Sequence, residues 1–131
     1  MDKVVICPVT ADDEAPPTFT EPDCRQTSAY ELNPQNKALW VKTYLTLSEQ
    51  IAADNQPYSV YLSGKASSRV FFNGVEIGKN GQPSINPQEE LIGRIDAMFY
   101  VSPELIQVGE NTLVLQLSSH NGFLTLNSPL N

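Results

Sequence analysis

The sequence predicts an all-β domain, a β-sandwich or a barrel, and three observations support this prediction. Several short segments alternate apolar and polar residues with a period of two, as half-buried strands do. Gly, Pro and Asn-Gly pairs separate these segments at short intervals, which is typical of sandwiches and barrels. No long amphipathic helical pattern occurs in the 131 residues, so the core is expected to lie between sheets.

The clearest alternation is "LWVKTYLTL", residues 39–47. One face carries the aliphatic residues Leu39, Val41, Leu45 and Leu47, and the other carries Trp40, Lys42, Tyr44 and Thr46. We expect further strands at 4–6, 58–64, 95–101, 112–119 and 123–126. In the strand 95–101 one side consists of Ile95, Ala97, Phe99 and Val101.

A hairpin is predicted at residues 69–78, where Asn73 and Gly74 alone interrupt a β-branched and aromatic run. A type I′ turn needs positive φ at both central residues, and Asn-Gly supplies this at the least steric cost. The second pair, Asn80 and Gly81, opens a long polar loop at 79–93 that is rich in Gly and Pro.

One helical turn is expected within "SPELIQVGEN", residues 102–111. Ser102 is a suitable N-cap, Pro103 suits the first helical position, and Glu104 suits the helix dipole. Leu105 and Ile106 are then expected to pack inward, and the turn ends at Gly109.

Two parts are expected along the chain: a Pro-rich N-terminal arm at 1–37, packed on the domain, and a β-sandwich at 38–131. The arm contains both cysteines, Cys7 and Cys24. A disulfide between them would stabilise the fold by about 3 kcal/mol on the chain-entropy model, and two unrelated thiols are the alternative. A disulfide implies an oxidising compartment, the periplasm or the cell exterior.

The charge balance excludes some partners. The net charge is −7 and the pI is near 4.5, so a basic stripe that could neutralise nucleic-acid phosphates is lacking. An anionic membrane surface is disfavoured for the same reason. No apolar run approaches the roughly 18 residues of a membrane span, and the apolar stretch at the start is too short for a signal peptide.

Catalytic chemistry is not expected. The single histidine, His120, could be combined with Ser118 or Ser119 and with Asp96 in a Ser-His-Asp set. However, the Gly-x-Ser-x-Gly pattern of a nucleophile elbow is absent, and a turn residue that contacts backbone is the alternative interpretation of His120. We therefore predict that the domain is not an enzyme.

The carboxylates Glu89 and Glu90 lie in the loop 79–93. They are interpreted as solvated charges, with a structural Ca²⁺ site as the alternative, since Ca²⁺ prefers carboxylate and carbonyl oxygens. No Asp-x-Asp repeat supports the alternative, and two cysteines do not make a zinc site. We predict no metal and no cofactor.

A ligand site is expected where polar side chains are not used by strand pairing. The loop 79–93 and the corner "SSHNG" supply the candidates Asn80, Asn86, Glu89, Glu90, Arg94, His120 and Asn121. If the face of Trp40 and Tyr44 is exposed, these two side chains form a second candidate, a platform for a sugar ring.

The order of "VFFNGVEIG", a loop, and "IDAMFYVSPELIQVGENTLVLQL" resembles the galactose-binding-like jelly rolls that accompany many glycoside hydrolases. The pattern of Leu105, Gly109, Asn111, Leu113 and Leu115 carries this resemblance. A narrower resemblance, over roughly residues 39–126 and the Cys7/Cys24 arm, is to extracytoplasmic sensor domains of bacterial signalling proteins, including the seven-transmembrane receptors with diverse intracellular signalling modules. Enzymes with such a jelly roll keep their catalytic residues in a separate barrel.

The resemblance implies a noncatalytic ligand-binding sensor domain on the periplasmic or extracellular side of a bacterial membrane. A small molecule or a carbohydrate would be the ligand, and binding would bias an attached membrane domain between two states. The alternatives are an accessory carbohydrate-binding module of a glycoside hydrolase and a structural domain that forms a homodimer.

Overall fold

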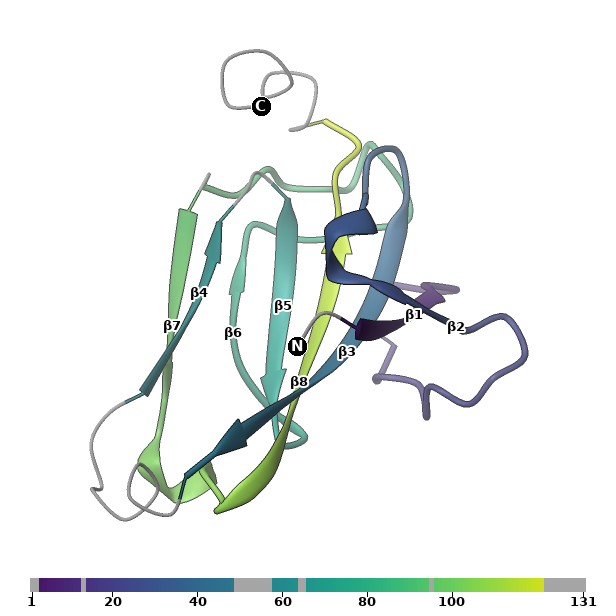
Figure 1. Ribbon diagram of the computed structural model, residues 1–131. Helices are drawn as coiled ribbons and strands as arrows, with labels where there is room; N and C mark the ends of the chain where they lie inside the picture. Colours follow the sequence, from purple (N-terminus) through teal and green to yellow (C-terminus); the bar gives the residue numbers. More distant parts are fainter. Residues whose placement is uncertain (1–2, 13, 49–57, 64–65, 95, 122–131) are drawn as a thin grey trace.

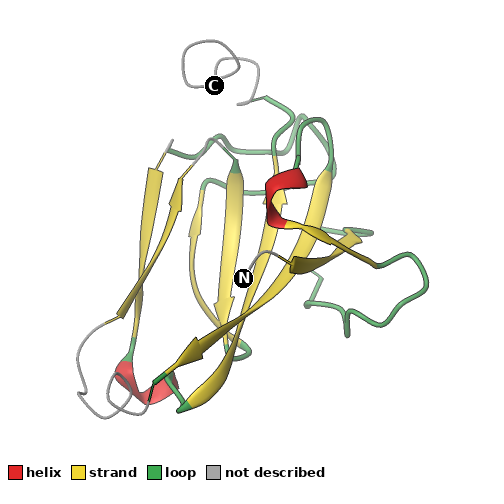
Figure 2. Ribbon diagram, viewed as in Figure 1, coloured by secondary structure: helices red, strands yellow, loops and turns green. Residues whose placement is uncertain are grey.

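The computed structural model describes residues 3–12, 14–48, 58–63, 66–94 and 96–121. Its strands are β1 (Lys3–Pro8), β2 (Arg25–Ser28), β3 (Ala38–Leu47), β4 (Tyr58–Ser63), β5 (Ser67–Phe72), β6 (Val75–Asn80), β7 (Asp96–Val101) and β8 (Gly109–Ser118). Two short 3-10 turns, Ala29–Glu31 and Pro103–Leu105, complete the regular structure of the described residues (Figure 2).

Two antiparallel sheets face each other, as Figure 1 shows. The larger sheet has the strand order β2-β1-β3-β8-β5-β6, and the smaller one pairs β4 with β7. The core between them is aliphatic and aromatic: Val4, Ile6, Val41, Val70, Phe72, Leu113 and Leu115 from the larger sheet, and Val60, Phe99 and Val101 from the smaller. The predicted all-β sandwich is confirmed.

The strand boundaries follow the alternation, but β1, β5 and β6 extend up to two residues beyond the expected ranges, so Lys79 and Asn80 belong to β6 and not to the loop. β8 begins at Gly109, three residues earlier than expected, because Gly109 to Asn111 already pair with the end of β3. β2 was not expected, since its sequence "RQTS" has no apolar face, yet it pairs with β1 at the edge of the larger sheet. The strand expected at 123–126, and Ile95 in the strand expected at 95–101, lie outside the described residues.

The hairpin at Asn73-Gly74 is confirmed, since φ is 47° at Asn73 and 86° at Gly74. The Asn73 side chain also connects this turn to Asn111 and Thr112 at the start of β8. Its amide nitrogen donates to the side-chain oxygen of Asn111 at 2.8 Å, and its own oxygen accepts the Thr112 N–H at 2.8 Å. The turn of β5–β6 is therefore fastened to β8.

The expected helical turn is present as Pro103–Leu105, and Ser102 occupies its N-cap position without capping it through the side chain. The Ser102 hydroxyl makes no cap hydrogen bond and donates instead to the Glu104 carboxylate at 2.6 Å. As expected, Leu105 and Ile106 pack against the core.

Candidate binding surface

The loop 79–93 and the corner 118–121 lie together, and Glu90 joins them. This side chain is only 7% exposed. Its carboxylate accepts the Ser118 hydroxyl and the backbone N–H groups of His120 and Asn121 at 3.0 Å. The His120 ring nitrogen Nε2 lies 2.9 Å from the carbonyl oxygen of Ser84. Three residues that were expected to contact a ligand, Glu90, His120 and Asn121, are thus engaged in hydrogen bonds within the protein.

The N-terminal arm extends this network. The Asp12 carboxylate accepts the Ser84 hydroxyl at 2.7 Å and the Ile85 N–H at 2.9 Å. Of the other loop candidates, Asn86 is exposed and its side-chain oxygen accepts the Gln88 N–H at 2.9 Å, while Glu89 is exposed. A buried carboxylate with several donors around it is a structural anchor, and this arrangement fixes the loop against the sheet.

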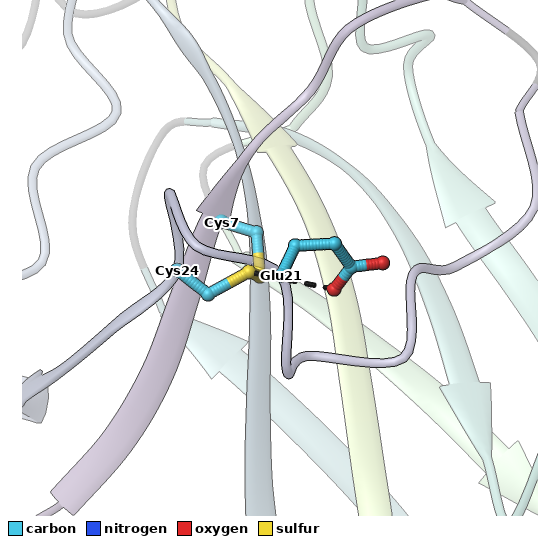
Figure 3. Close-up of side chains that lie close together, drawn as sticks. All are labelled: Cys7, Glu21 and Cys24. Atoms are coloured by element: carbon cyan, nitrogen blue, oxygen red, sulfur yellow. Dashed lines mark hydrogen bonds between the residues drawn. A yellow bond between two sulfur atoms is a disulfide. The ribbon is translucent and has the colours of Figure 1, made fainter.

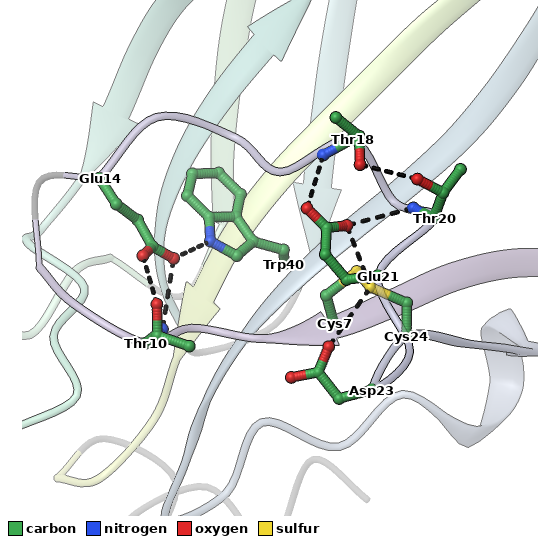
Figure 4. The surroundings of a disulfide bond; sticks show 9 residues. All are labelled: Cys7, Thr10, Glu14, Thr18, Thr20, Glu21, Asp23, Cys24 and Trp40. Atoms are coloured by element: carbon green, nitrogen blue, oxygen red, sulfur yellow. Dashed lines mark hydrogen bonds between the residues drawn. A yellow bond between two sulfur atoms is a disulfide. The ribbon is translucent and has the colours of Figure 1, made fainter.

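Trp40 forms no exposed platform with Tyr44, because the arm covers it. Its side chain is 0% exposed and packs with Phe71 on the outer face of the larger sheet. The indole N–H donates to the Glu14 carboxylate at 2.6 Å, as Figure 4 shows. Partial burial raises the pKa of Glu14, but hydrogen bonds from Trp40 and Thr10 outweigh it, so the pKa lies below its ordinary value.

The disulfide between Cys7 and Cys24 is present, and it ties the segment of the arm that covers Trp40 to β1 (Figure 3). A carboxylate oxygen of Glu21 lies 3.6 Å from the Cys24 sulfur. Backbone N–H groups, that of Glu21 itself foremost, hold the pKa of this carboxyl below its ordinary value. The three side chains converge, but sulfurs that share a bond are not thiolate ligands, so the cluster does not suit a metal ion.

The outer face of the smaller sheet carries a row of exposed apolar side chains that sequence reasoning missed. Tyr61 on β4 and Met98 on β7 lie directly opposite each other, and Tyr100 is the next residue on the same face of β7. Their exposed fractions are 59%, 68% and 59%. The signal is present in "DAMFYV", because Asp96, Met98 and Tyr100 alternate with the core-facing residues of β7.

A groove of about 610 Å³ lies beside this row, between β6 and β7. Its polar lining consists of Tyr61, Lys79, Asn80, Arg94 and Asp96. The negative charge of Asp96 raises the pKa of the Tyr61 phenol above its ordinary value, and the carboxylate also favours the protonated phenol by accepting a hydrogen bond from it. Gly78 and Phe99 also line the groove, and they lie so close that a Cβ at Gly78 would be 2.9 Å from the Phe99 ring.

Asn80 and Arg94, both expected as ligand contacts, lie at this groove. The Asn80 side chain holds the backbone of Arg94 at two points: its oxygen accepts the Arg94 N–H at 2.8 Å, and its nitrogen donates to the Arg94 carbonyl at 2.9 Å. Gly81, with φ of 70°, lets the loop close, and Gln82 and Leu91 exchange backbone hydrogen bonds. The Asn80 amide is thus occupied, whereas the Arg94 side chain is exposed.

The row and the groove offer apolar contact, hydrogen bonding and charge within one surface. Tyr61, Met98 and Tyr100, here called the β4–β7 row, present exposed apolar area together with two phenol groups. Asp96 can accept hydrogen bonds, and Lys79 and Arg94 can donate them. Such a surface is suited to bind a flat, partly polar ligand.

No protein-family model and no curated protein matches the sequence. Solved structures do match. A β-D-mannosidase from Dictyoglomus thermophilum superposes with a TM-score of 0.58 at 14% identity, over 89% of this chain and 15% of the enzyme. A β-glucuronidase from an uncultured Clostridium species superposes with a TM-score of 0.58 at 13% identity, over 88% of this chain and 21% of the enzyme.

The chain therefore has a β-sandwich fold that also occurs within glycoside hydrolases, where it makes up a minor part of each named enzyme. At this level of identity the likeness is one of fold. Within the part of the chain that the structure describes, no helix has the length and apolar character needed to cross a membrane.

Proposed function

We propose that this chain is a noncatalytic carbohydrate-binding domain of a larger extracytoplasmic protein, with its ligand site on the β4–β7 row and the adjoining groove. The observation that carries the proposal is the exposure of two tyrosines and a methionine side by side on one sheet face. Scattered exposed apolar residues need no explanation, but a contiguous row beside a polar groove points to recognition.

Carbohydrate fits this surface better than a purely apolar ligand does. A sugar ring has an apolar face that can lie on a tyrosine ring, and its hydroxyls need donors and acceptors at the edge. The Tyr61 phenol and the Asp96 carboxylate provide these within hydrogen-bonding reach of each other. The named structural neighbours act on mannosides and glucuronides, as their names state, which agrees with a sugar ligand.

A noncatalytic role is supported by the surroundings of the groups that could react. Ser118 is 0% exposed, and its hydroxyl both donates to Glu90 and accepts the Ser84 N–H. The His120 ring is engaged with the Ser84 carbonyl. A nucleophile needs access to substrate and a base that is not otherwise occupied, and neither condition holds at this corner.

The oxidising compartment is inferred from the disulfide, which persists in the periplasm or outside the cell. In the sensor role that the sequence resemblance implies, ligand binding would bias an attached membrane-bound signalling protein. A second candidate is an accessory module of a glycoside hydrolase. It is favoured by one observation: the matched part of both named neighbours belongs to such an enzyme.

The test of binding is a glycan array followed by calorimetry on the variants Tyr61→Ala and Tyr100→Ala. Each is expected to weaken binding about two- to tenfold, since an aromatic stacking contact is worth about 0.5–1.5 kcal/mol. Tyr44→Ala is the matched control, because Tyr44 is 42% exposed but lies on the larger sheet. Equal loss in all three variants would refute this site. No glycan binding together with a concentration-dependent dimer would favour the structural role instead.

A further inference from the structure

The groove beside the β4–β7 row gathers positive charge on a strongly acidic chain. The sequence has 15 acidic and 8 basic residues, yet two of the basic side chains, Lys79 and Arg94, line this one groove. Asp96 is the one carboxylate among its lining residues. The formal charge of the lining is thus +1, against −7 for the whole chain.

Neither basic side chain at the groove forms an ion pair with a carboxylate of the described residues. Lys79 donates to a neutral group, the Gln82 side-chain oxygen, at 3.1 Å, and Arg94 forms no ion pair within the described ranges. Arg69 shows the contrast, because its guanidinium is paired with Glu76 at 3.2 Å. A cation without an ionic partner is suited to meet an anionic ligand.

The backbone of Arg94 is fixed before any ligand arrives. Asn80 clamps both its N–H and its carbonyl, and a Cβ on the preceding Gly93 would collide with the Asn80 amide. The clamp therefore depends on glycine at 93. A guanidinium whose backbone is anchored needs less ordering on binding, which improves affinity.

We propose that the groove binds the carboxylate of an acidic sugar, such as a uronic acid unit in a glycan. This inference rests on the proposed function, because it assigns the sugar class to the same surface. Arg94 and Lys79 hold the carboxylate, Tyr61 lies against the sugar ring, and Asp96 accepts a hydroxyl. A guanidinium presents paired donors that match a carboxylate. A lining of +1 is balanced by one such group, whereas a doubly charged phosphate would overcompensate it.

The experiment compares uronic acid oligosaccharides with the same oligosaccharides after chemical reduction of their carboxyl groups, by calorimetry at low and at high salt. The native oligosaccharide is expected to bind about tenfold more tightly, and this advantage should shrink at high salt. Arg94→Gln is expected to abolish the advantage while leaving the weaker binding of the reduced oligosaccharide. Arg25→Gln is the matched control, since it removes the same charge from an exposed position on β2.

Failure of this inference is distinguishable from failure of the proposed function. Equal affinity for native and reduced oligosaccharides, still lowered by Tyr61→Ala, would overturn the acidic-sugar assignment and leave the carbohydrate site standing. A sulfated glycan without uronic acid that binds as tightly through Arg94 would overturn the choice of a carboxylate. If neither oligosaccharide binds, and a broad glycan array also finds no ligand, both proposals fall.

Discussion

Replacement of Asn111 by Ala is expected to lower the free energy of unfolding by about 4 kcal/mol. The side chain is 0% exposed and makes four hydrogen bonds. Its oxygen accepts from the Gln107 N–H at 2.9 Å and from the Asn73 amide at 2.8 Å. Its nitrogen donates to the carbonyls of Gln107 and Gly109 at 2.9 and 3.2 Å. Each is worth about 1 kcal/mol net, and the partners left behind are largely out of reach of water.

Urea denaturation followed by circular dichroism measures this loss. The midpoint should fall while the slope stays constant, because the surface exposed on unfolding is nearly unchanged. The control is Asn86→Ala, which removes one hydrogen bond from an exposed loop asparagine, with an expected loss below about 1 kcal/mol. If Asn111→Ala also cost less than 1 kcal/mol, the side-chain contact between the hairpin and β8 would not be a principal support of the fold.

Three further variants test the arm and the hairpin. Cys7→Ser with Cys24→Ser should lower the free energy of unfolding by about 3 kcal/mol, and thiol titration of the unfolded, unreduced wild type should find no thiol. Glu14→Gln should flatten the loss of stability on acidification: the Glu14 pKa is lowered in the fold, so its contribution is present above the ordinary value of 4.5 and disappears as pH falls through the folded pKa. Gly74→Val should cost more than about 1 kcal/mol because of its positive φ alone, since a Cβ there meets nothing within 4 Å; an unchanged thermal melt would contradict this.

Local patterns predicted the strands and the hairpin because they depend on neighbouring residues. Alternation at 39–47 gave both faces of β3 correctly, and Asn73-Gly74 specified its own turn through the φ values it tolerates. The polar strand β2 carries no such local signal. Its pairing with β1 comes from the path of the arm, which the disulfide fixes.

The environment of Trp40 could not be predicted from alternation, which separates two faces of a strand without saying what covers either. The arm covers this face through Phe19 and Cys24, and Glu14 satisfies the indole N–H. A count of polar residues in loop 79–93 likewise says nothing about their neighbours in the fold. It could not reveal that the Glu90 carboxylate accepts hydrogen bonds from Ser118 and His120.

The central claim, that the ligand site lies on the outer face of the smaller sheet, is tested most directly by nuclear magnetic resonance. Backbone amide shifts of the labelled domain are followed while an acidic oligosaccharide is added. The largest shifts are expected at 59–61 on β4 and at 96–100 on β7, with smaller ones at Lys79 and Arg94. Shifts concentrated at 84–90 and 118–121 would place the site at the loop cluster around Glu90 and contradict the account.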